Sequence, residues 1–378
     1  MKICLIYDFL TEYGGIERLI VNHAKILRES GFDVEILTCH INKEVIEKMN
    51  LSREKIINIS LIKTPFESIS LATSYLGLNK LDKLKADAFL SYSFPSSFMI
   101  RNKKAIKINY VNHFPHFLYF KGKNKKEWAT STYGIKRKIS IILSWLFGPW
   151  LKNMDIKLIK NSILNFVNSN FTKKGLEKLY KTNMVLNYPV LDPVFKPSKN
   201  KLNEKFIFTS GRIIASKKFE WVIEACSLMK NKMPLYISGQ GDKTYQKNLL
   251  DLARKLKVDL KFLGRLDTGE LIKYYTSAQV SAFPIPKFEF GLVPVESIAC
   301  GTPVIVWGDN GGQCEIIING VNGYHAKPYD RKDFAHKMDK IIDSKFKAKN
   351  KRKIILSSRK FSYKKLKENF IAEINKLF

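Results

Sequence analysis

Residues 2–38 decide the fold class and read KICLIYDFLTEYGGIERLIVNHAKILRESGFDVEILT. The apolar run from Lys2 to Asp8 predicts a buried strand, and apolar residues at helical spacing from Leu19 to Arg28 predict a helix that ends before Gly31. The run from Val34 to Thr38 predicts a second strand. A strand, a glycine-bearing turn, a helix and a strand in this order open a doubly wound α/β sheet.

The turn between the first strand and the helix spans Thr11–Arg18 and contains Gly14 and Gly15. Paired glycines let the backbone approach a bound group closely, and a plain tight turn uses them equally well. Both interpretations stay open on spacing alone.

Further strands are predicted at Ile57–Ile62, Ala88–Tyr92 and Ile106–Val111, and His113 follows the last of these. In an open parallel sheet, a residue just beyond the carboxyl end of a strand faces the ligand crevice. His113 is therefore placed for a proton or phosphate contact, although a single histidine in an aromatic loop is more often structural.

The second half of the chain restarts the pattern. A strand is predicted at Phe206–Ser210, a loop at Gly211–Lys218 and a helix at Glu220–Met229. Arg212 and Lys217 on this loop can clamp a diphosphate, the arginine as a planar fork and the lysine as a point charge. Because the chain is so basic, the alternative is that Arg212 and Lys217 are two surface cations that lie close together by chance and bind no diphosphate.

The elements that follow have the same character. They are a strand and glycine turn at Leu235–Asp242 with Gly241, a strand at Leu260–Gly264, a helix at Glu270–Ser277, a strand at Val280–Pro284 and a glycine loop before a helix at Gly308–Glu315. Residues from Asp330 onward are expected to be helical, with an apolar stripe formed by Leu366, Phe370, Ile371, Ile374 and Leu377. This last helix either returns to the first domain or lies on a membrane.

The stretch from Pro284 to Val306 is predicted to hold the centre of the site. It reads as a loop with Glu289, then a helix opened by Pro294 and ended by Gly301, then an apolar strand. Glu296 is expected in the first helical turn, where backbone N–H groups are unpaired, and its carboxylate suits the two hydroxyls of a ribose. A glutamate near a helix start is also common for dipole reasons alone.

Composition limits the classes of partner. The 378 residues include 65 Lys and Arg against 34 Asp and Glu, a formal charge of +31, which predicts attraction to polyanions. The five cysteines are scattered without close pairs, so we expect neither a disulfide framework nor a zinc site.

Aromatic and basic residues alternate from Phe120 to Ile163, around the apolar run Ile139–Leu151. That run is shorter than the roughly 20 residues needed to cross a bilayer, and the N-terminus is too short in apolar residues for a signal peptide. The expected location is therefore cytoplasmic. The segment fits an anionic membrane surface, a core helix with a basic rim or, less well, single-stranded nucleic acid.

The run from Phe290 to Ile305 resembles a signature of the group 1 nucleotide-sugar glycosyltransferases of family 4 (GT4). That signature is a glutamate, seven residues, a second glutamate and a helix ending in Gly-Thr-Pro-Val-Ile. The second glutamate matches Glu296, whereas the first falls on Phe288, with Glu289 one place later.

Other segments resemble the same family. The family motif Gly-Gly-x-Glu-Arg is present from Gly14 to Arg18, and the family motif Asn-Ser-x-Phe-Thr is present from Asn168 to Thr172. The family pattern His-x-Pro-x-Arg fits His113 and Pro115, with His116 in place of the arginine.

The resemblance implies the GT-B fold, with two Rossmann-like doubly wound domains at 1–195 and 202–355 facing across a cleft and a terminal helix at 356–378. It implies transfer of a hexose, such as mannose or glucose, from a UDP- or GDP-sugar to an acceptor hydroxyl, with retained configuration. The basic and aromatic segment adds the expectation of a glycan or lipid-linked acceptor. The family places the leaving diphosphate on the Gly-Arg and Lys of the second domain, which are Gly211, Arg212 and Lys217 here.

The remaining site residues are assigned with the resemblance in view. Glu296 is expected on the ribose, His113 on a sugar hydroxyl or the acceptor proton, and Glu289 as a catalytic carboxylate. Further donor contacts are expected from Gly14, Gly15, Gly241, Phe290, Gly291, Leu292 and Val293. No Asp-x-Asp occurs, so we expect no metal cofactor.

Two other functions remain open at this point. A polyanion-binding protein without catalysis would explain the charge, and a sugar-nucleotide epimerase of the same architecture would bind the same donor. Nucleic acid is not expected as the partner.

Overall fold

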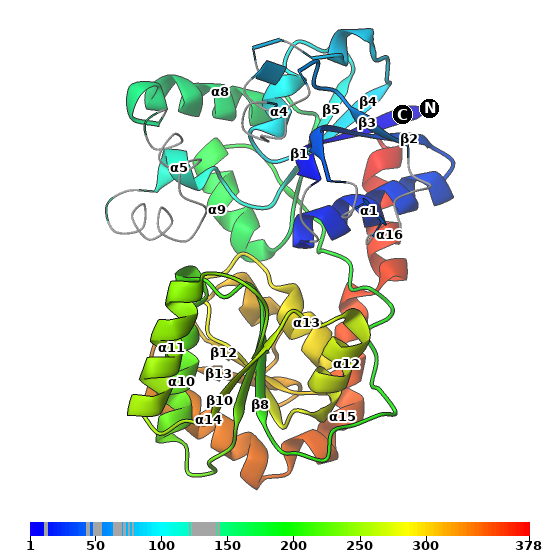
Figure 1. Cartoon of the computed structure of the whole chain (residues 1–378). Coiled ribbons are helices and arrows are strands. Elements are labelled where there is room, and N and C mark those ends of the chain that lie inside the picture. The colour runs from blue at the N-terminus through cyan, green and yellow to red at the C-terminus, as the bar shows by residue number, and fades with distance from the viewer. Residues whose placement is uncertain are drawn as a thin grey trace. The chain divides into compact units, whose positions relative to one another are not determined.

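The computed structural model describes residues 1–10, 14–42, 46–47, 55–62, 70, 73–74, 76–77, 79–120, 122, 142 and 144–378. The chain divides into two compact units (Figure 1). The first unit holds the described residues up to Val190 together with Leu366–Phe378, and the second holds Leu191–Lys365.

The first unit is built on a seven-stranded parallel sheet in the order β3-β2-β1-β4-β5-β6-β7. Its strands are β1 (Lys2–Leu10), β2 (Asp33–Ile41), β3 (Ile56–Asn58), β4 (Ala88–Tyr92), β5 (Ile106–Val111), β6 (Leu164–Val167) and β7 (Val185–Leu186). Ile3 at the centre pairs with Val34 on one side and Ala88 on the other. Strands covered on both faces read as continuous apolar runs, which is why the sequence predicts them well.

Helices of the first unit are α1 (Gly15–Glu29), α4 (Ser96–Met99), α5 (His116–Tyr119), α8 (Gly148–Lys160), α9 (Asn170–Tyr180) and α16 (Tyr363–Asn375), with the 3-10 turn η1 (Leu81–Lys83). Ser169 caps α9, because its side chain accepts a hydrogen bond from Thr172 N–H. The terminal helix α16 packs on α1, where the Phe370 ring stacks on His23 at 4.3 Å.

The second unit has a six-stranded parallel sheet in the order β10-β9-β8-β11-β12-β13. Its strands are β8 (Ile207–Ser210), β9 (Leu235–Ser238), β10 (Leu260–Gly264), β11 (Val280–Phe283), β12 (Val304–Trp307) and β13 (Gly323–Ala326). The strand order reverses between β8 and β11. Ligands of open α/β sheets bind beyond the carboxyl ends of the strands at such a switch point.

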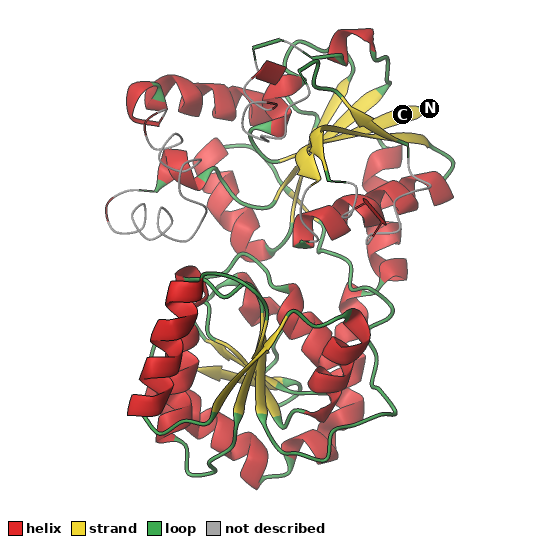
Figure 2. Cartoon of the chain, viewed as in Figure 1, coloured by secondary structure: helices red, strands yellow, loops and turns green. Residues whose placement is uncertain are grey.

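Two layers of helices cover this second sheet (Figure 2). They are α10 (Phe219–Leu228), α11 (Lys243–Lys255), α12 (Thr268–Ser277), α13 (Leu292–Ala299), α14 (Arg331–Asp343) and α15 (Phe346–Ser357), with the 3-10 turns η2 (Ala215–Lys217), η3 (Gly312–Glu315) and η4 (Ser358–Phe361). The aspartates Asp242, Asp267 and Asp330 cap α11, α12 and α14 through their side chains. Two doubly wound halves confirm the predicted fold class.

Several predicted boundaries are wrong. Helix α1 begins at Gly15, inside the predicted turn, with Glu17 in its first turn, where the helix dipole favours an acid. The strand predicted at 57–62 ends at Asn58, and Ser60 then forms one antiparallel bridge with Asn79.

Helix α13 begins at Leu292, two residues before its predicted start at Pro294. Proline is tolerated at the third position, because an N–H there would have no partner inside the helix. Glu296 therefore lies in the second turn, and the expectation of a first-turn carboxylate is wrong. The predicted stop at Gly301 is confirmed, since Gly301 has φ +84° and Thr302 N–H donates to Ser297 O at 3.0 Å.

Helix α11 and strand β13 were not predicted from the sequence. Only Leu249 and Ala253 of α11 are buried, so its apolar periodicity is weak. The helix expected after Gly308–Glu315 is only the 3-10 turn η3, whereas the helices expected beyond Asp330 are present as α14, α15 and α16. Among the described residues, no helix is both long enough and apolar enough to span a bilayer.

Candidate active site

The loop that follows β8 carries the two predicted phosphate-binding cations. Arg212 is exposed, and Lys217 lies half-buried in η2 with its Nζ 4.1 Å from the centre of the Phe288 ring. The pKa of Lys217 is lowered to about 8, mainly by burial and also by the charge of Arg212, while the carboxylate of Glu289 opposes the shift. The structure thus brings Arg212, Lys217 and Glu289 into one electrostatic site.

The loop that follows β11 presents Glu289 to this site. Glu289 is half-buried, and the neighbouring Phe290 is buried with its ring 5.5 Å from the Phe361 ring. Gly291 has φ +142°, and a Cβ there would lie 3.0 Å from the Phe283 ring, so the position favours glycine. Leu292 and Val293 follow as the first residues of α13, where backbone N–H groups have no partner inside the helix.

Asp309, just beyond β12, holds the Glu289 loop in place. Its carboxylate is buried and accepts hydrogen bonds from Lys287 N–H at 2.7 Å, Gly311 N–H at 3.0 Å and the Gln313 amide at 2.9 Å. The same Gln313 amide lies 3.4 Å from Ile285 O. The sequence does not single out Asp309 and Gln313, although the glycines around them are a signal of a close backbone approach.

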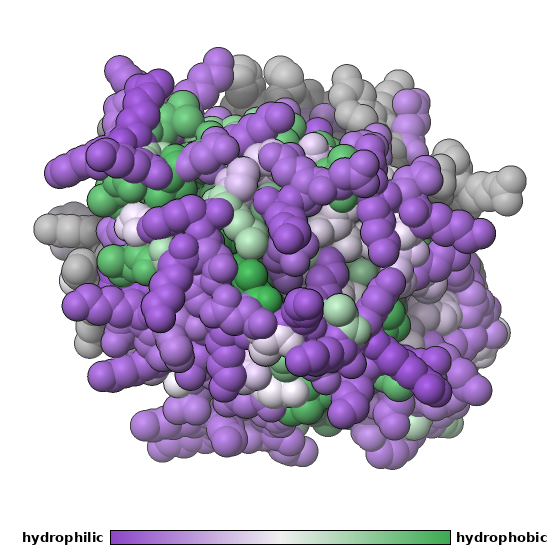
Figure 3. All heavy atoms as spheres, turned by 90° about the horizontal axis from the view of Figure 1, so that it is seen from below, coloured by the Kyte–Doolittle hydropathy of each residue, from purple (hydrophilic) through white to green (hydrophobic). Residues whose placement is uncertain are grey.

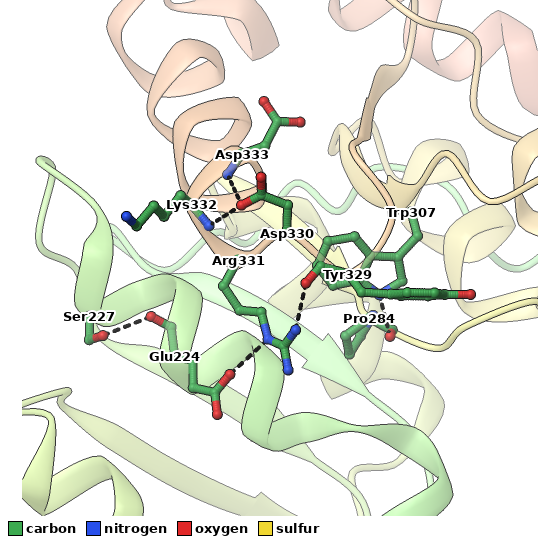
Figure 4. Close-up of polar contacts among 9 residues, drawn as sticks. All are labelled: Glu224, Ser227, Pro284, Trp307, Tyr329, Asp330, Arg331, Lys332 and Asp333. Carbon is green, nitrogen blue, oxygen red and sulfur yellow. Dashed lines mark hydrogen bonds and ion pairs between the residues drawn. The ribbon is translucent and has the colours of Figure 1, made fainter.

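Gly312 lets the two loops pack against each other. Its N–H donates to Phe288 O at 2.7 Å, and a Cβ at Gly312 would lie 1.9 Å from Glu289 O. The indole N–H of Trp307 donates to Pro284 O at 2.6 Å, at the start of the Glu289 loop (Figure 4). These contacts fix the backbone that carries Glu289.

A second network ties α10 to the same strand end (Figure 4). Arg331 at the start of α14 forms an ion pair with Glu224 of α10 at 2.8 Å, and its guanidinium lies 4.6 Å from the Trp221 ring centre. The Trp221 ring also meets the Trp307 ring edge-on at 5.8 Å. Because α10 follows the loop of Arg212 directly, this network fixes one end of that loop.

Glu296 is buried in α13 and is held by a tyrosine. Tyr275 OH donates to Glu296 Oε2 at 3.2 Å, and the same hydroxyl lies 2.6 Å from Ser210 Oγ at the end of β8. Burial, together with the nearby Glu296 carboxylate, raises the pKa of Tyr275 well above its usual value. Tyr275 therefore stays protonated and fixes the carboxylate beside the loop of Arg212.

Gly241 has a packing role in the structure. A Cβ there would lie 2.1 Å from Ile213 O, and one at Gly239 would lie 1.9 Å from Gly211 O. Ile213 N–H donates to Gln240 O at 2.9 Å. These glycines allow the loop after β9 to support the loop that carries Arg212.

In the first unit, Gly14 and Gly15 form the start of α1. Gly14 is the N-cap residue, and a Cβ there would lie 2.5 Å from Glu17 Oε2. The absence of a side chain at Gly14 thus makes room for Glu17 to fold back over the helix start.

His113 follows β5 as predicted and belongs to a stack of rings. Its Nδ1 lies 2.9 Å from Phe114 O, and its ring lies 4.5 Å from the His116 ring. His116 in turn stacks on Phe120 at 4.3 Å. The stack orients His113 at the carboxyl edge of the first sheet.

The described residues contain no group of three His, Cys, Asp or Glu side chains that could hold a metal ion. Much of the predicted basic and aromatic segment from Phe120 to Ile163 lies outside the described residues, which cover 120, 122, 142 and 144–163 there.

Comparison with solved structures identifies the class of fold. The chain matches Anabaena HepE, solved in complex with UDP-glucose, with a TM-score of 0.77, 15% identity and full coverage of both chains. At this identity the likeness shows the fold alone, and it confirms the GT-B class.

Sequence comparison finds a glycosyltransferase family that the second unit resembles. The profile described as "Glycosyl transferases group 1" matches residues 192–361. An uncharacterized glycosyltransferase of Methanocaldococcus jannaschii is 36% identical over 144 residues, which are 37% of this chain and 36% of that protein. One of Haemophilus influenzae is 22% identical over 344 residues, which are 88% of this chain and 87% of that protein. Residues 192–361 are therefore similar to the group 1 glycosyl transferases, which are enzymes.

Proposed function

We propose that the chain transfers a hexose from a nucleoside-diphosphate sugar to an acceptor hydroxyl. The observation that carries the proposal is the convergence of Arg212, Lys217 and Glu289 at the switch point of the second sheet. A diphosphate is the anion that suits an exposed guanidinium beside a half-buried ammonium.

In the proposed reaction, the bond between the sugar C1 and the diphosphate oxygen breaks, and a bond from C1 to the acceptor oxygen forms. The diphosphate leaves with the electron pair of the broken bond, and the acceptor proton passes to His113 or to the departing phosphate. Arg212 and Lys217 stabilise the charge that develops on the leaving group. We also propose that the sugar keeps its anomeric configuration, because the family resemblance implies it. We propose a reaction without a metal ion, because the sequence has no Asp-x-Asp motif.

Glu296 is proposed to bind the ribose hydroxyls, and the backbone from Gly291 to Val293 a phosphate or the sugar. The solved complex of HepE with UDP-glucose favours UDP as the first donor to test, with GDP as the second. We propose a glycan or lipid-linked acceptor in cell-envelope or protein glycosylation, a cytoplasmic location and peripheral contact with the membrane.

Product analysis with radiolabelled UDP- and GDP-sugars tests this function. With a membrane-lipid extract as acceptor, transfer predicts label in a new glycoconjugate together with free nucleoside diphosphate. An epimerase would instead yield free or epimerised sugar without an acceptor. If neither occurs and salt-dependent gel shifts show nucleic acid binding that survives Glu296→Ala, the polyanion-binding alternative replaces this proposal.

The pH profile provides a second prediction. Because the pKa of Lys217 is lowered to about 8, the free enzyme loses this positive charge as the pH rises through 8. We expect kcat/KM to fall above pH 8, and kcat to fall only at higher pH, because a bound diphosphate stabilises the ammonium. Lys217→Arg keeps its charge and should abolish the decline near pH 8. A profile that is unchanged in Lys217→Arg would contradict this role.

A third prediction concerns the shifted carboxylate. If Glu289 takes the place of the glutamate that the family carries one residue earlier, Glu289→Gln should lower kcat about 10-fold or more, since a hydrogen bond to a charged group contributes about 1.5–3 kcal/mol. Steady-state kinetics measures this, with Glu270→Gln on the surface of α12 as the matched control. Full activity of Glu289→Gln would remove Glu289 from the mechanism.

A further inference from the structure

A cluster of exposed apolar side chains lies at and before the start of α8. Trp145 is 79% exposed and Trp150 is 53% exposed. Ile142, Leu146 and Phe147 are exposed with them. Single exposed apolar residues need no explanation, but several so close together in the sequence, two of them tryptophans, indicate an interaction site. On the face seen in Figure 3, by contrast, hydrophilic side chains cover most of the surface.

Positive charges accompany this cluster along α8. Trp150, Asn153, Lys157 and Lys160 are all exposed, at helical spacing that places them on one side of the helix. The acidic residue of α8, Asp155, is buried on the other side. The outer side of α8 therefore carries lysines and no carboxylate.

The buried side of α8 anchors it to the first unit. Asp155 Oδ2 accepts hydrogen bonds from Tyr119 OH and Tyr180 OH, each at 2.8 Å. Leu158 and Ile159 are buried beside it. The prediction of a core helix with a basic rim therefore accounts for the buried side of α8. It does not explain the exposed aromatic rings at the start of the helix.

An aromatic residue, Phe98, and a cationic residue, Arg101, lie beside this cluster. The Phe98 ring meets Trp150 edge-on at 6.4 Å, and the Arg101 guanidinium lies 4.0 Å from the centre of the Phe98 ring. Aromatic rings with cations beside them suit the boundary between lipid headgroups and acyl chains.

The chemistry of the cluster separates the three classes of occupant. A second copy of the same chain would bring another +31 of charge to a basic surface, which opposes association. Nucleic acid would use the rings for stacking, but the aliphatic Ile142 and Leu146 offer no ring face. Acyl chains accept both kinds of side chain, and anionic headgroups accept the lysines.

We infer that residues 142 and 144–160 form a docking surface for an anionic membrane, with Trp145, Phe147 and Trp150 in the interface and Lys157 and Lys160 on headgroup phosphates. The surface lies outside the donor site, so it stands or falls separately from sugar transfer. It gives the enzyme access to acceptors held in the membrane.

Vesicle co-sedimentation of the full chain tests the inference. Wild type should bind vesicles of phosphatidylglycerol and phosphatidylcholine more tightly than vesicles of phosphatidylcholine alone. The double variant Trp145→Ser/Trp150→Ser should lower the partition coefficient about 10-fold or more. Lys157→Ala/Lys160→Ala should lower it about 10-fold on anionic vesicles only, and added salt should remove that difference.

A matched control uses Leu228→Ser/Leu356→Ser, which removes two exposed apolar side chains of the second unit and should leave binding unchanged. Circular dichroism melting verifies that each variant is folded. The inference is overturned if wild type ignores anionic vesicles, or if the tryptophan variant binds them equally well. It is also overturned if sedimentation equilibrium shows a dimer that the tryptophan variant abolishes, or if that variant loses nucleic acid binding and keeps vesicle binding.

Discussion

Lys217→Ala and Arg212→Ala are each expected to lower kcat on the order of 10²-fold or more, the loss typical when one preorganised group that stabilises developing charge is removed. The reason is geometric, because both side chains come from the loop after β8 and the pKa of Lys217 responds to Arg212. Release of nucleoside diphosphate from a UDP- or GDP-sugar, with a membrane-lipid extract as acceptor, measures the effect.

Two further variants make this result specific. Arg212→Lys keeps the charge and loses the planar fork, so its kcat should lie between those of wild type and Arg212→Ala. Arg254→Ala removes an exposed arginine of α11 that pairs with Asp251, and should leave turnover unchanged. Near-normal rates for both Lys217→Ala and Arg212→Ala would exclude them from leaving-group stabilisation.

Glu296→Ala is expected to raise the Kd for the nucleoside diphosphate about 10- to 100-fold, since each hydrogen bond to a carboxylate contributes about 1.5–3 kcal/mol. Isothermal titration with UDP and with GDP measures this change. Glu296→Gln keeps an acceptor for Tyr275 OH and should lose less affinity than the alanine variant.

Tyr275→Phe separates positioning from direct contact. It removes the hydroxyl that lies between Ser210 and Glu296 but leaves the carboxylate in place. Its Kd should rise less than that of Glu296→Ala. Unchanged nucleotide affinity in Glu296→Ala, with the fold intact by circular dichroism, would rule out the ribose contact.

The sequence predicts those helices and strands whose buried residues form a clear local pattern of apolar side chains. The strands at Ala88–Tyr92, Ile106–Val111 and Leu260–Gly264 lie where the apolar runs place them. Gly301 ends α13 as expected, because glycine there adopts a positive φ at little cost. By contrast, α11 buries only Leu249 and Ala253, so its pattern falls below what periodicity can detect.

The arrangement of the candidate site follows from the sequence only in part, for the same reason. Arg212 and Lys217 share one short loop, so their proximity follows from the chain itself. The contacts of Asp309 with Lys287 and of Gly312 with Phe288 join loops that follow different strands, and no local pattern encodes them. Glu296 lies one turn later than predicted because α13 begins two residues before Pro294, and proline is tolerated throughout the first helical turn.

Crystals of the chain soaked with UDP-glucose or GDP-mannose test the central claim most directly. The account predicts the diphosphate within about 3 Å of Arg212 and Lys217, and the ribose hydroxyls on the Glu296 carboxylate. A nucleotide bound away from the loop after β8, or no binding at saturating concentration, would contradict it.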